Sequence, residues 1–205
     1  MYSSQVLPYD RPTSEMTPKE IKAAFSLAME QMPIRIENVS EYIYKRHAVR
    51  LSPSSSNEEL DSLPSLIGAV GALRDQSEEE FESRLVGISP HAIDAMRSVL
   101  TRKELDGPTT LMVFDGALLW GEAFRLRYPH ATWAIGAKPK SSICYGEPVL
   151  VGTSTNRHEF YPVTQLHGQV GRYLLGLENV RSLSWLMRMR AYQLGFGPNP
   201  LQDEK

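Results

Sequence analysis

The fold is decided by residues 109–128, which read TTLMVFDGALLWGEAFRLRY. Apolar residues occupy most sides of a helix drawn from this stretch, whereas a surface helix carries one apolar stripe. Gly116 and Gly121 allow a neighbour to approach closely, although each costs about 1 kcal/mol relative to Ala in a helix. We therefore expect a central helix that other elements contact from several directions.

The pattern changes after Tyr128-Pro129. Short β-rich runs alternate with turn residues, and the runs span residues 131–135, 143–145, 149–151 and, as an edge, 158–161. Closely spaced turns favour antiparallel hairpins over crossover units. Pro162 then begins another helix with apolar residues at helical spacing. This order predicts a small antiparallel β-meander of three or four strands between two helices.

The first third of the chain has helical patterning. Thr17 and Glu20 form a capping-box signal with Pro18 in the first turn. The apolar spacing predicts one helix that Pro33 ends and a second helix from about Ile36. Leu60, Leu63, Ile67 and Val70 mark a third helix, with Pro64 in its first turn or at a kink. Further helix starts are expected at Ser77, at Ser89 and at Asn179. The predicted fold class is α+β, mainly helical.

The length of 205 residues fits one domain, which we expect to span residues 17–197. Residues 1–16 are rich in Pro, Ser and Tyr without a sustained period, which predicts a flexible amino-terminal arm. Residues 198–205 are expected to form a loose tail.

Charge and hydropathy exclude several classes of partner. The 22 basic and 24 acidic side chains give a net charge of −2 without a basic stripe, so no nucleic-acid partner is expected. No window approaches the roughly 20 apolar residues of a membrane span, and the first 16 residues lack a signal-peptide core. We expect no membrane partner and a cytoplasmic location.

Candidate catalytic groups are few. Cys144 is the single cysteine, and with His158 or His167 it could act as a nucleophile with a base. Asp115 or Asn156 could orient that base. Such combinations also arise by chance, so no catalytic residue is assigned. No histidine pair has ligand spacing and no glycine motif follows a strand, so neither a metal nor a cofactor is expected.

Candidate binding residues cluster around the central helix. Glu122 lies among small and apolar neighbours, and a buried carboxylate there needs a partner such as Arg125. Tryptophan is either core or an interface anchor. Trp133 is the better anchor candidate because a meander strand has one exposed face, and Trp120 is the second. The predicted binding residues are Trp133, Glu122, Arg125 and Trp120.

One resemblance rests on the helix 116–122 with its Gly-Glu pair, Trp133, the strand 148–150, and the helix that Pro162 begins. Together they look like a loose group of uncharacterised small bacterial α+β proteins, some of them proposed as immunity proteins of polymorphic toxin systems. The resemblance implies a non-enzymatic module that masks a protein partner such as a cognate toxin. The alternatives are a small hydrolase-like enzyme that uses Cys144 or a carboxylate (Glu122 or Asp115), and a structural subunit such as a homodimer.

Overall fold

The computed structural model describes residues 2, 6–9, 11, 13–85, 103–137, 139–140, 142, 144–152, 158–178 and 181–202. The fold is α+β and mainly helical, as predicted, and it contains two small antiparallel sheets. Its helices are α1 (Pro18–His47), α2 (Asn57–Asp61), α3 (Leu63–Val70), α4 (Glu78–Leu85), α6 (Gly107–Arg127), α7 (Pro162–Leu174) and α8 (Leu183–Gln193), with short 3-10 turns η1 (Thr13–Glu15) and η2 (Pro200–Gln202). Its strands are β1 (Leu73–Asp75), β2 (Lys103–Leu105), β3 (Thr132–Ile135), β4 (Pro148–Val151) and β5 (Glu159–Phe160).

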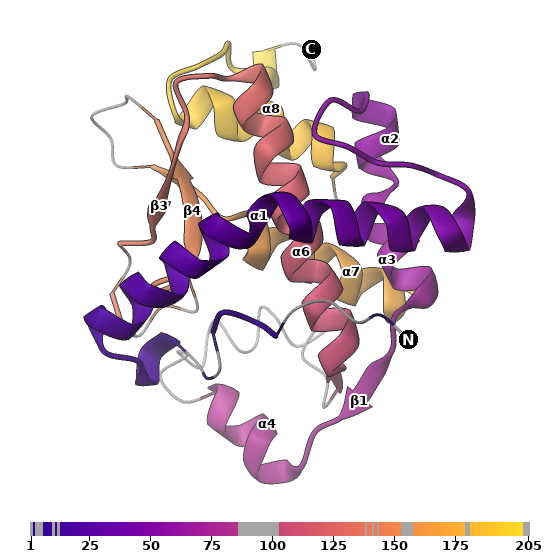
Figure 1. Cartoon of the computed structure of the whole chain (residues 1–205), viewed down its shortest axis with the longest axis vertical. Coiled ribbons are helices and arrows are strands. Elements are labelled where there is room, and N and C mark those ends of the chain that lie inside the picture. The colour runs from indigo at the N-terminus through magenta and orange to yellow at the C-terminus, as the bar shows by residue number, and fades with distance from the viewer. Residues whose placement is uncertain are drawn as a thin grey trace.

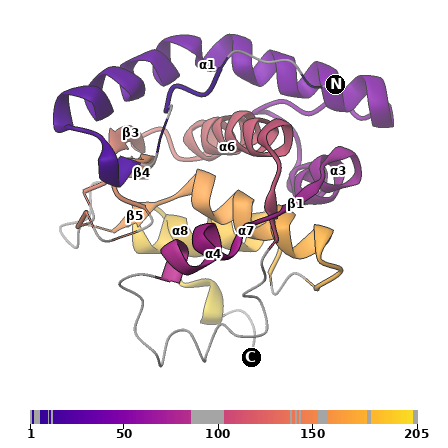
Figure 2. The same ribbon diagram turned by 90° about the horizontal axis from the view of Figure 1, so that it is seen from below.

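The central helix is α6. The Asp106 side chain caps it by accepting a hydrogen bond from the Thr109 backbone N–H at 2.8 Å. Helices α1, α3 and α7 all pack against it, and Figure 2 shows α6 lying between α1 and α7. Its broad apolar surface is thereby covered from several directions, which confirms the expectation from residues 109–128.

The three-stranded sheet has the order β3-β4-β5. Trp133 pairs with Leu150, which pairs with Phe160 on the next strand. The predicted strand at 143–145 is wrong at Cys144 and Tyr145, which lie in a turn, and Ile143 lies outside the described residues. Sequence reasoning also missed the sheet formed by β1 and β2, because three-residue strands show too few alternations to be recognised.

Helix α1 runs through Pro33, so the predicted break there is wrong (Figure 1). Proline inside a helix removes one backbone hydrogen bond, and the side chain of Pro33 is exposed to solvent. The buried stripe continues on both sides of this position, from Ile21 to Ile43. Continuous burial of that stripe outweighs the lost hydrogen bond. The capping box of Thr17 and Glu20 is formed as predicted.

Only some of the other predicted helix starts lie within the described residues. Pro64 lies in the first turn of α3, and Ser77 forms a capping box with Glu80. Helix α8 is capped by Ser182, whose hydroxyl accepts from the Trp185 N–H at 3.2 Å. Ser89 and Asn179 lie outside the described residues. No helix in the described part of the chain is long and apolar enough to cross a membrane.

The described residues of the amino-terminal arm pack against the helices, which the sequence did not indicate. Tyr2 is 7% exposed and its hydroxyl donates to Asp115 Oδ2 at 2.6 Å. The Val6 carbonyl accepts from Arg35 Nη2 at 2.6 Å. Flexibility of the arm stays a prediction, but its contacts attach it to α1 and α6. At the other end, Pro200 is buried within η2.

Candidate functional site

Three of the four predicted binding residues meet in one cluster. Trp133 Nε1 donates to Glu122 Oε1 at 2.6 Å. Arg125 Nη1 donates to both oxygens of the same carboxylate, at 3.0 and 3.2 Å. Glu122 therefore has the partner that the sequence suggested. The Trp133 ring is half-buried and lies so close to Gly121 that an added Cβ would be 2.4 Å from it. These contacts hold β3 against α6. The indole N–H of Trp133 is therefore already used in a hydrogen bond within the chain.

Trp120 lies in the core, which corrects its prediction as a binding residue. Its side chain is 0% exposed and its ring meets Phe160 edge to face, with centroids 4.8 Å apart. A surface partner has no access to it. The spacing of apolar residues in α6 could not show that Trp120 is buried, because apolar residues lie on every side of that helix.

A second group is a buried ion pair. Arg35 Nη1 and Asp115 Oδ1 lie 2.8 Å apart, and both side chains are 0% exposed. Gln31 accepts two further bonds from the guanidinium, and Tyr2 donates to the carboxylate. Buried charges are tolerated when hydrogen bonds satisfy them in this way. The pair links α1 to α6 and secures the arm.

The structure places Asp115, one of the groups considered for a cysteine nucleophile, in the core ion pair. Asn156 lies outside the described residues. Cys144 Sγ lies 3.6 Å from Thr164 Oγ1, which itself donates to Glu147 Oε2 at 2.7 Å. His158 is exposed. Asp115 is therefore not available to orient a histidine at Cys144.

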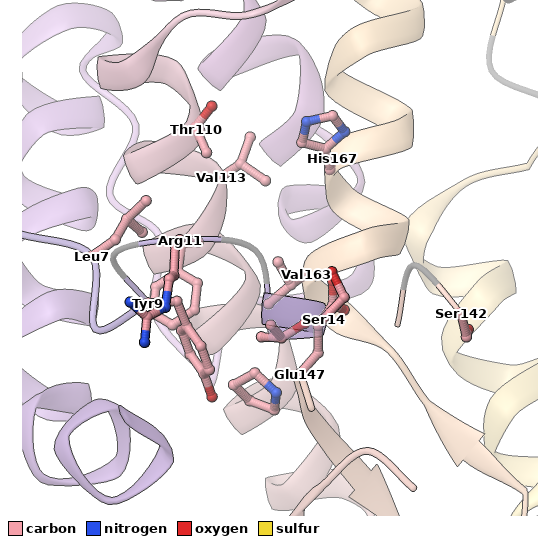
Figure 3. Close-up of a pocket in the computed structure, with 13 residues that line it drawn as sticks. Leu7, Tyr9, Arg11, Ser14, Thr110, Val113, Ser142, Glu147, Val163 and His167 are labelled. Carbon is pink, nitrogen blue, oxygen red and sulfur yellow. The ribbon is translucent and has the colours of Figure 1, made fainter. Parts of the chain in front are cut away.

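One pocket lined by described residues has a volume of about 350 Å³, and we call it the arm pocket. Figure 3 shows the arm residues Leu7, Tyr9 and Arg11 on one side, with residues of α6 and α7 opposite them. The walls are mainly apolar, and the apolar lining comprises Leu7, Val113, Phe114, Pro148 and Val163. The volume lies at the lower end of the range of about 300–1,000 Å³ that is usual for ligand pockets.

The buried Tyr9 hydroxyl and the half-buried Glu147 side chain line this pocket. The Tyr9 hydroxyl is buried and makes no hydrogen bond with any described residue. Burial raises the pKa of Tyr9, and the nearby charge of Glu147 raises it further, so the phenol stays protonated. Burial also raises the pKa of Glu147, although two hydrogen bonds from Thr164 act in the opposite direction. A buried hydroxyl without a protein partner is available to hydrogen-bond a bound ligand or an ordered water.

The mouth of the arm pocket carries exposed polar side chains. Arg11, Ser14 and His167 line the pocket and are exposed to solvent. The Arg11 guanidinium lies 2.5 Å from the Glu20 carboxylate, so its charge is already balanced. A ligand would therefore meet balanced charges at the entrance and the Glu147 carboxylate deeper inside.

Sequence reasoning missed both Tyr9 and Glu147. Tyr9 lies in a segment whose composition indicated a flexible arm, and Glu147 lies in a connection between strands. One signal was present: a carboxylate immediately before β4, whose first three residues are buried. The arm pocket forms only when the amino-terminal arm packs over α6 and β4. These segments are far apart in the sequence.

Among the described residues, no group of three or more His, Cys, Asp or Glu side chains could hold a metal ion. No family model, curated protein or solved structure matches the chain. The resemblance to immunity proteins stays a prediction.

Proposed function

We propose that this chain is a non-enzymatic binding protein whose ligand is a small, largely apolar molecule held in the arm pocket. The observation that carries the proposal is the buried Tyr9 hydroxyl, which lines an apolar pocket and has no hydrogen-bond partner among the described residues. Ligand sites combine apolar walls with a few polar groups that fix orientation. The arm pocket has this composition.

The masking of a protein partner has weaker support. That interpretation needs exposed aromatic anchors at the centre of a surface patch. Trp120 is buried, and Trp133 is half-buried with its N–H bonded to Glu122. A concave pocket that contains a carboxylate with a raised pKa favours recognition of a small molecule over a flat protein interface.

Catalysis at Cys144 also has less support than binding. Its thiol contacts the Thr164 hydroxyl, and the carboxylate proposed to orient a base is used in the Arg35 ion pair. The proposed site of action is the bacterial cytoplasm, where a single thiol stays reduced. A toxin or another protein partner would then be a second ligand, outside the arm pocket.

The first test is a calorimetric titration with 1-hexanol, a neutral probe with an apolar chain. We expect saturable binding with a dissociation constant on the order of 1 mM, given the affinity per atom of small ligands. Val163→Phe would place a ring in the pocket and is expected to weaken binding by about tenfold or more, because ligand and ring compete for the same volume.

The matched control is Leu126→Phe, which adds a ring at an exposed position of α6. This variant is expected to bind 1-hexanol like the wild type. Equal binding by Val163→Phe and the wild type would place the site elsewhere. No saturable binding by the wild type would contradict the proposed function.

A further inference from the structure

We propose that the arm pocket selects a small organic cation, an amine with a short apolar body, through the Glu147 carboxylate. This inference rests on the proposed function and specifies the chemical class of its ligand. Three features of the pocket carry it: a carboxylate without a cationic partner, two aromatic rings, and a mouth whose positive charge is already balanced.

The first of these features is the carboxylate of Glu147. Thr164 is the hydrogen-bond partner of Glu147, through its hydroxyl at 2.7 Å and its backbone N–H. Within the described part of the chain, no Lys, Arg or His side chain forms an ion pair with Glu147. Buried charges in proteins are normally paired. An ammonium ligand would supply the missing charge and favour the ionised form of Glu147, which opposes the effect of burial on its pKa.

The aromatic rings add a second attraction. Tyr9 and Phe114 both line the pocket, with ring centroids 6.1 Å apart and planes inclined by 60°. The faces of aromatic rings carry negative potential and attract cations. The Phe114 ring already has the Arg35 guanidinium 5.5 Å from its centroid, so this ring takes part in one cation contact inside the protein.

The Tyr9 oxygen provides a further acceptor. An ammonium group has only donors, and it needs several acceptors when it leaves water. The buried Tyr9 oxygen has no hydrogen-bond partner among the described residues. A ligand ammonium could donate to this oxygen and to the Glu147 carboxylate, whereas a ligand carboxylate would face Glu147 with a like charge.

Charges at the mouth do not favour an anion. Arg11 is the cation of the pocket rim, and Glu20 neutralises it at 2.5 Å. The Arg35 charge behind Phe114 is neutralised by Asp115. His167 is exposed at the rim. The uncompensated charge of the pocket is therefore the carboxylate of Glu147.

The test compares n-hexylamine, 1-hexanol and hexanoate by calorimetry at pH 7.5, because these probes each have six carbon atoms and differ in the charge of their polar end. We expect n-hexylamine to bind about tenfold or more tightly than 1-hexanol, as charge-assisted hydrogen bonds are stronger than neutral ones. Hexanoate is expected to bind most weakly.

Two variants and a control locate the effect. Glu147→Gln keeps the shape and an acceptor for Thr164, and it is expected to abolish the preference for n-hexylamine while 1-hexanol binding changes by less than about twofold. Tyr9→Phe is expected to weaken n-hexylamine by about threefold through the lost acceptor. Glu30→Gln, an exposed carboxylate of α1, should bind all three probes like the wild type.

The outcomes separate the two proposals. If none of the probes binds, the proposed function fails and the inference fails with it. If 1-hexanol and n-hexylamine bind equally, the pocket is a ligand site but the inference is overturned. Tightest binding by hexanoate, or an n-hexylamine preference that survives in Glu147→Gln, overturns it as well.

Discussion

Replacing Arg35 by Met is expected to lower the free energy of unfolding by about 3–5 kcal/mol, because it leaves a buried charge without its partner. Both Arg35 and Asp115 are 0% exposed, so water cannot solvate the remaining carboxylate. The substitution also removes the bonds from Arg35 to Gln31 and to the Val6 carbonyl. Urea denaturation followed by circular dichroism measures the change.

The double variant Arg35→Met, Asp115→Leu is the informative partner of this experiment. It removes both charges, and replacement of a whole buried pair by apolar side chains is often close to neutral. We expect it to recover most of the lost stability. The control Lys45→Met breaks the exposed pair with Glu41 and is expected to leave the denaturation curve almost unchanged. A single variant as stable as the wild type would show that the pair is not buried.

Trp120→Ala is expected to destabilise the protein by about 3–5 kcal/mol, the cost of a large cavity in a packed core. Its ring contacts Phe160 of β5, so the cavity would separate α6 from the sheet. Chemical denaturation gives the change in the free energy of unfolding. A surface anchor would behave differently, with near wild-type stability.

Trp120→Phe is the matched variant. The Trp120 Nε1 group has no hydrogen-bond partner among the described residues, so its removal costs no hydrogen bond. The smaller ring keeps most of the packing, and we expect a change of less than about 1.5 kcal/mol. Equal and small effects of the alanine and phenylalanine variants would contradict the core position of Trp120.

The helices around α6 could be predicted because their information is local. Asp106 precedes a long helical segment that is apolar on all sides, and a helix of this kind is buried in the core. The Glu122 and Arg125 pair was predictable for the same reason, since residues three apart on a helix are neighbours. The predicted helix end at Pro33 was wrong because it followed the local rule that proline ends a helix. The prediction did not consider the buried apolar stripe that continues on both sides of Pro33.

The arm pocket could not be predicted because its parts come from distant segments. Tyr9, Val113, Glu147 and Val163 meet only after the arm folds back over α6. The contacts that return it, from Tyr2 to Asp115 and from Arg35 to the Val6 carbonyl, join residues that share no local pattern. Composition alone therefore described the arm as unstructured.

The position of a bound amine tests the central claim most directly. Intermolecular nuclear Overhauser effects between n-hexylamine and methyl-labelled protein are expected at Leu7, Val113 and Val163, which line the arm pocket. Effects confined to Leu27 and Ile34, which are 41% and 46% exposed on α1, would contradict the proposal by placing the ligand on the outer surface of that helix.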